Sequence, residues 1–213
     1  MCLKVCNERH TSERPRMTGY SYAIVETALA RVFRIKPADQ KAFFRGRLQH
    51  LRRLGLPGKG RGRGGGPPRA YSDNETCELL IALELEEFGI DPALAVRMVT
   101  GQTGPDQRAE GSDWQHYLPK VIQEARKGSG GDADIILMVE PYFMSAPGRG
   151  DPRFDPATFR HVKADSAGIK EFEHLLRGWG AGTPDRVCAF NLSERLRSLD
   201  AALKAVQEED KAP

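Results

Sequence analysis

Apolar residues recur at helical spacing through the first third of the chain. Over residues 22–33 they fall on one side of a predicted helix, at Ile24, Ala28, Leu29 and Val32. A second helix is predicted over residues 38–54, because Pro37 suits its first turn and Gly55 and Pro57 end it. The pattern therefore predicts two consecutive amphipathic helices.

The second of these helices has two different faces. Phe44, Leu48 and Leu51 share an apolar face at the i, i+4, i+7 spacing. About a right angle away, a polar stripe carries Lys41, Arg45, Gln49 and Arg52. We expect the apolar face to pack against the core and the stripe to offer long cationic and amide side chains to a ligand.

Turn and capping signals divide the residues that follow. Residues 58–68 read GKGRGRGGGPP, which cannot pack a core and predicts a loop or a hairpin tip. Ser72 and Glu75 form a capping box before a third helix, over residues 73–88. Asp91 caps a short fourth helix, over residues 92–99.

The second half of the chain mixes strands and helices. A helix is predicted over residues 114–126, the best strand of the chain at Ile135–Val139, weaker strands over residues 159–162 and 186–190, and a helix around residues 170–176. Asn191 and Glu194 cap a last helix with an apolar heptad seam at Leu192, Leu196, Leu199, Leu203 and Val206. The seam is a candidate for dimerisation, although so short a helix also suits docking on its own domain, and the sequence leaves both interpretations open.

These elements define an expected organisation. The fold class is a mainly α winged helix-turn-helix in the N-terminal half, followed by an α+β C-terminal domain. Residues 1–18 are expected to be a disordered tail, 19–100 the winged-helix domain, 101–112 a linker, and 113–213 a dimerisation or effector domain.

Charge is strongly segregated along the chain, although the net charge is only +3. Residues 31–70 hold twelve Lys or Arg and a single acid, Asp39, a surplus of +11. Residues 71–213 carry a net −9. A basic block joined to an acidic body favours a polyanion as the partner of the basic block.

Other classes of function find little support in the sequence. The four cysteines form no disulfide framework, and Cys2, Cys6 and His10 make a poor zinc site in a polar tail, so we expect no metal and no cofactor. No nucleophile motif or ligand spacing is present, and we expect no enzyme. A small-ligand-binding or hydrolytic C-terminal domain is a weaker alternative. Without an apolar run of membrane-spanning length or a hydrophobic signal core, a cytoplasmic, nucleoid-associated protein without membrane contact is expected.

The order helix, helix, basic glycine-rich loop, helix is the plan of a winged helix-turn-helix. An α-helix fits the DNA major groove, where base edges can be distinguished, and a basic wing contacts phosphates. Candidate DNA-binding residues on the second helix are those of the stripe, with Arg53 beside them: Lys41, Arg45, Gln49, Arg52 and Arg53. Candidates on the wing are Lys59, Arg61, Arg63, Arg69 and Tyr71, of which Tyr71 suits either a phosphate contact or a place in the core.

Three phrases in this order resemble the head of MerR-type bacterial transcription regulators. They are LRRLGLP at residues 51–57, RAYS at residues 69–72 and ELEEFGI at residues 84–90. The resemblance covers residues 22–99 and implies DNA binding as a homodimer, on an inverted-repeat promoter site, with RNA polymerase as a possible further partner. The chain departs from the family in its longer, glycine-rich wing, in AFFRGRLQH where the family has TLRYYE, and in lacking an obvious long dimerisation helix. An RNA-binding role for the Arg/Gly tract is the alternative.

Overall fold

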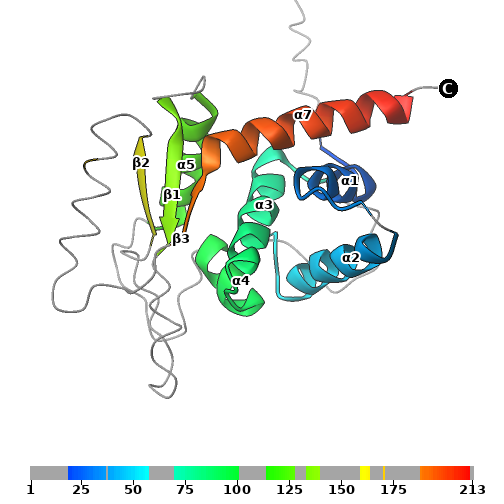
Figure 1. The fold of residues 1–213 in the computed structure, drawn as a ribbon, viewed down its shortest axis with the longest axis horizontal. Coiled ribbons are helices and arrows are strands. Elements are labelled where there is room, and N and C mark those ends of the chain that lie inside the picture. Colours follow the sequence, from blue (N-terminus) through cyan, green and yellow to red (C-terminus); the bar gives the residue numbers. More distant parts are fainter. Residues whose placement is uncertain are drawn as a thin grey trace, which may run out of the picture.

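The computed structural model describes residues 19–36, 38–57, 70–100, 114–127, 133–139, 159–163, 170 and 188–211 (Figure 1). The predicted tail, wing, linker and the helix around residues 170–176 therefore lie outside the described residues, apart from Ala70, Tyr71 and Lys170. The elements in chain order are α1 (Tyr22–Val32), α2 (Ala38–Arg53), α3 (Asp73–Glu87), α4 (Pro92–Thr100), α5 (Trp114–Lys127), β1 (Ile135–Val139), β2 (Phe159–Lys163), β3 (Cys188–Asn191) and α7 (Leu192–Lys211).

The described part of the chain is mostly helical, with one small antiparallel sheet in its second half. Its strand order is β2-β1-β3, and Leu137 at the centre of β1 lies opposite His161 on one side and Phe190 on the other. The predicted strand at Ile135–Val139 is thus confirmed, and it is the central strand. Four of its five residues are buried, because α5 and α7 cover it.

Local signals set the ends of the helices in the first half. The Ser21 side chain caps α1 by accepting a hydrogen bond from the Ile24 N–H at 3.3 Å. After α2, Gly55 adopts a backbone φ of +105°, which residues with a Cβ rarely adopt. The chain turns back there, so that the Leu56 N–H donates to the Leu51 carbonyl at 3.0 Å.

Helix α3 is the central element of the molecule. The predicted capping box at its start is confirmed: the Ser72 side chain accepts from the Glu75 N–H, and the Glu75 carboxylate accepts from the Ser72 N–H at 2.9 Å. Nearly every residue from Thr76 to Leu85 is buried. A helix buried on all sides has neighbours all round, and α2 and α4 are among those of α3.

The apolar seam of α7 packs inside the same chain. Each seam residue is at most 7% exposed: Leu192, Leu196, Leu199, Leu203 and Val206. Helix α7 lies across α1 and contacts α5 and β1 (Figure 1). This corrects the assignment of the seam to dimerisation, because side chains already buried against α1, α5 and β1 are not available to a second chain.

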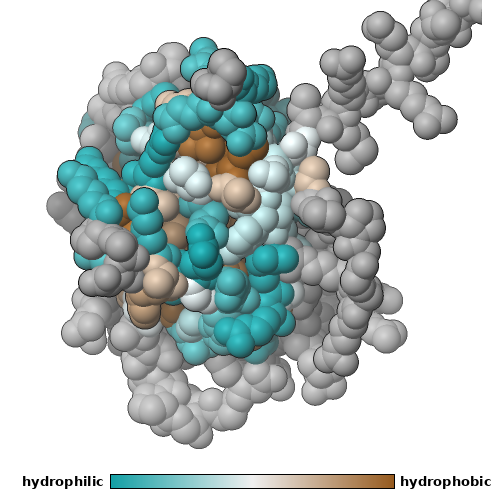
Figure 2. All heavy atoms as spheres, turned by 90° about the vertical axis from the view of Figure 1, so that its right-hand side faces the viewer, coloured by the Kyte–Doolittle hydropathy of each residue, from teal (hydrophilic) through white to brown (hydrophobic). Residues whose placement is uncertain are grey.

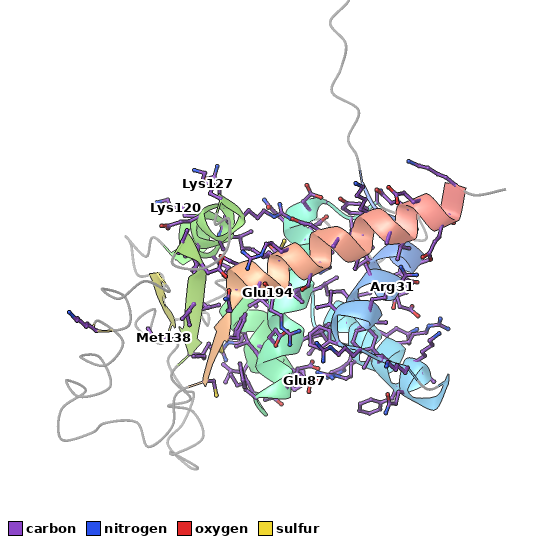
Figure 3. All side chains as sticks on the ribbon, turned by 45° about the horizontal axis from the view of Figure 1, so that its top comes forward. Arg31, Glu87, Lys120, Lys127, Met138 and Glu194 are labelled. Carbon is purple, nitrogen blue, oxygen red and sulfur yellow. The ribbon has the colours of Figure 1, made fainter. Side chains whose placement is uncertain are left out.

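Ion pairs reinforce the packing of α7 on the N-terminal helices. Arg195 contacts the buried Glu84 of α3 at 2.8 Å, and its guanidinium lies 5.6 Å from the Phe33 ring centre. Arg31 of α1, visible beside α7 in Figure 3, contacts Glu209 near the C-terminal end of α7. One continuous hydrophobic core accordingly includes residues of both predicted domains. Among the described helices, none is long and apolar enough to cross a membrane.

Candidate nucleic-acid interface

Helix α2 is fixed by its apolar face and by one arginine. Phe44 is 2% exposed, and its ring centre lies 5.9 Å from that of Phe33, in the turn after α1. On the side facing α3, Arg47 donates to Glu86 at 2.7 Å and to Glu87 at 2.5 Å. Because the Arg47 side chain is 19% exposed, this pairing holds α2 against α3 and leaves Arg47 little access to a ligand.

Four of the five predicted contact residues on α2 are exposed: Lys41, Arg45, Gln49 and Arg53. They lie away from the buried Phe44, Leu48 and Leu51. Within α2 as a whole, the sequence ADQKAFFRGRLQHLRR has five Lys or Arg and one acid. The exposed part of α2 is therefore cationic and rich in hydrogen-bond donors.

Arg45 is exposed as predicted, but it is paired with Glu26 of α1. The guanidinium approaches the carboxylate to 2.7 Å, and the Arg45 side chain remains 60% exposed. The hydrogen bond to Glu26 raises the pKa of Arg45 above its ordinary value. The Glu26 side chain is only 15% exposed, so the pair holds Arg45 against α1 while part of the guanidinium still reaches solvent.

Arg52 also contacts α1, through an aromatic ring. Its guanidinium lies 4.6 Å from the centre of the Tyr22 ring, a distance typical of a cation–π contact. Burial raises the pKa of Tyr22, with Glu26 adding to the effect and Arg52 opposing it. Arg45 and Arg52 thus lie at the interface between α1 and α2. The predicted stripe divides into this pair and the more outward Lys41 and Gln49.

Tyr71 is a core residue. Its side chain is 5% exposed, and its ring centre lies 6.2 Å from that of Tyr22. Of the two roles that the sequence left open for Tyr71, this burial favours the place in the core over the phosphate contact. Its main chain pairs with Tyr20, each N–H donating to the other carbonyl at 2.8 and 2.7 Å.

The two ends of the glycine-rich segment, residues 58–69, are held by described residues. Before it, the buried Leu56 and Pro57 follow α2. After it, Ala70 lies so close to Gly19 that a Cβ on Gly19 would collide with the Ala70 Cβ. The segment therefore leaves and rejoins the folded part beside α1 and α2, while Lys59, Arg61, Arg63 and Arg69 themselves lie outside the described residues.

Another exposed face of α2 includes the predicted Arg53 together with Phe43, which sequence reasoning did not select. Phe43, Gly46, His50 and Arg53 follow one another at three- and four-residue steps, and all four are exposed. Phe43 is 72% exposed. The signal was available, because adjacent residues on a helix point about 100° apart, and on a helix with a single buried face only one of two adjacent phenylalanines lies at the centre of that face. The side of the molecule nearest the viewer in Figure 2 is predominantly hydrophilic in its coloured part.

No known protein-family model matches this sequence, and a search of curated proteins gives no significant match. Within the described ranges, no three His, Cys, Asp or Glu side chains are grouped closely enough to hold a metal ion.

Proposed function

We propose that this protein is a sequence-specific, double-stranded DNA-binding transcriptional regulator with a MerR-like winged-helix head. The observation that carries the proposal is the exposed side of α2, where Lys41, Gln49 and Arg53 stand away from a buried apolar face on a helix with five cations. In this proposal α2 lies in the major groove and the glycine-rich segment contacts phosphates.

The packing of α2 supports this role. Phe44 and Arg47, one turn apart on α2, anchor the helix to the turn after α1 and to α3. A helix held in this way enters a groove without losing much further conformational freedom, which favours affinity. Arg45 and Arg52 lie at the interface between α1 and α2, where in this proposal they contact phosphates at the edge of the groove.

The described residues on either side of residues 58–69 support a wing. Both flanks are fixed next to α1 and α2, so in this proposal the segment begins and ends near the DNA that α2 contacts. The glycines suit a backbone that approaches phosphates closely, and cations on such a backbone contribute affinity that is independent of sequence.

A single head reads only a few base pairs, so the proposal includes a homodimer on an inverted repeat. The α7 seam is excluded from that dimer interface by its burial within the chain. Contact with RNA polymerase belongs to the same proposal as a further partner at the promoter.

The test is selection of DNA fragments by the full-length protein, followed by binding measurements on the enriched duplex. Gln49→Ala and Arg53→Ala are each expected to weaken binding to that duplex by roughly 5- to 150-fold, corresponding to about 1–3 kcal/mol. Gln123→Ala on α5 and Lys204→Ala on α7 are the matched controls, since both residues are exposed and lie on other helices.

Equal binding by the α2 variants and the controls would refute the assignment of α2. Enrichment of RNA over every duplex would replace the regulator with the RNA-binding alternative. Circular dichroism of each variant checks that the fold is kept.

A further inference from the structure

Phe43 is the single large hydrophobic side chain that is exposed among the residues that the structure describes. Its neighbour Phe44 is 2% exposed and belongs to the core, so the two rings have separate roles. Because Phe43 is 72% exposed, it contributes little to the stability of this chain. The ring is therefore available for a contact outside the chain.

The surroundings of Phe43 indicate what that contact is. It lies in the second turn of α2, the end of a recognition helix that meets base edges. On the same face, His50 follows at i+7 and Arg53 at i+10, with Gly46 between them and Phe43. An ideal Cβ placed on Gly46 meets nothing within 4 Å, so no side chain of the described residues fills the space at Gly46.

A protein partner fits this face poorly. One phenylalanine offers at most about 200 Å², whereas a stable protein interface covers about 800 Å² on each partner. The exposed polar residues on the same face of α2 are His50 and Arg53, and the rest of the exposed side of the helix carries Lys41 and Gln49. A cationic surface with one apolar group in it complements a surface that is anionic overall and has an isolated apolar group.

The DNA major groove has that chemistry. Thymine places its C5-methyl group there among hydrogen-bond donors and acceptors, and Phe is one of the side chains that contact it. We propose that Phe43 reads a thymine methyl group in the target site and so determines specificity at that base pair. This inference rests on the proposed function, and it specifies the base and the chemical group that Phe43 contacts, the C5-methyl group of thymine.

The experiment uses the full-length protein and the duplex that it enriches, with each thymine replaced in turn by deoxyuridine, which lacks only the methyl group. When deoxyuridine replaces thymine at the one or two positions that Phe43 contacts, the affinity of the wild-type protein is expected to fall roughly fourfold. This is the change expected for burial of one methyl or methylene group. Phe43→Ala is expected to bind the unmodified duplex with the same loss and to show no further loss with deoxyuridine. Phe43→Leu, which keeps an apolar side chain, is expected to retain most of the methyl dependence.

The outcomes separate the two proposals. Specific duplex binding with no methyl dependence at any thymine, or with the same dependence in Phe43→Ala, overturns the role of Phe43 and leaves the regulator standing. Absence of specific duplex binding overturns both. If Phe43→Ala binds DNA as the wild type does but sediments as a smaller species, Phe43 contacts a second copy and the inference is wrong. Unchanged thermal unfolding of Phe43→Ala shows that the fold is intact.

Discussion

Replacement of Leu199 by Ala tests whether α7 belongs to the core of a single chain. Leu199 is 0% exposed and lies in the middle of the seam. Truncation of a buried leucine removes its transfer free energy and leaves a cavity, and about 3 kcal/mol is expected here. For a chain of this length that loss lowers the melting temperature by roughly 6–12 °C.

The assay is thermal unfolding of the full-length protein at concentrations that span about a hundredfold range. If the seam is internal, the difference between wild type and Leu199→Ala is the same at every concentration. A seam shared by two chains would instead make the melting temperature rise with protein concentration, and truncating it would weaken that rise. Lys204→Ala, at an exposed position of α7, is the control and is expected to change stability by less than about 0.5 kcal/mol. A concentration-dependent difference would refute the assignment of the seam to the internal core.

Three further predictions follow from buried groups and from the wing. Burial raises the pKa of Cys77 to about 12, so its alkylation at about pH 8 is expected to be roughly a thousandfold slower than in the unfolded chain, as peptide mapping can measure. Equal rates would show that Cys77 is accessible. Burial also raises the pKa of Glu84, with Arg195 opposing. A carboxyl group whose pKa is raised in the folded state contributes stability at pH values below the ordinary glutamate pKa. That contribution is lost as the pH rises through the folded-state pKa. Over this window the free energy of unfolding of the wild type, measured in urea, is expected to fall relative to that of Glu84→Gln. Parallel pH profiles would contradict this. Neutralising Lys59, Arg61 and Arg63 together is expected to flatten log affinity against log salt by roughly one unit for each lost phosphate contact, and an unchanged slope with lost specificity would show that the wing reads bases.

Sequence reasoning succeeded where a signal is local. The Ser72–Glu75 capping box predicted the start of α3, and Asp91 caps α4 as expected by accepting from the Ala93 N–H at 2.9 Å. Ile135–Val139 was found as a strand because a short β-branched apolar run carries its own signal.

It failed where the outcome depends on distant partners. The spacing of the α7 seam predicted a buried face, but the same spacing serves a coiled coil and an internal helix equally well. The stripe on α2 was found by its spacing, yet the contacts of Arg45 with Glu26 and of Arg52 with Tyr22 depend on how α1 packs against α2. Phe43 was missed because Phe44, Leu48 and Leu51 already form a complete apolar face, and that face has the same spacing whether residue 43 is apolar or polar.

The position of α7 across α1 also has a consequence for biosynthesis. Val25, Ala28 and Leu29 are fully buried, and α7 is a principal neighbour of the helix that carries them. The ion pair between Arg31 and Glu209 joins residues 178 positions apart. On the ribosome α1 is made well before α7, so α1 gains this cover only when α7 has emerged. A nascent chain thus exposes apolar surface on α1 until α7 is made, and a product truncated before α7 is expected to be a substrate for chaperones and proteases.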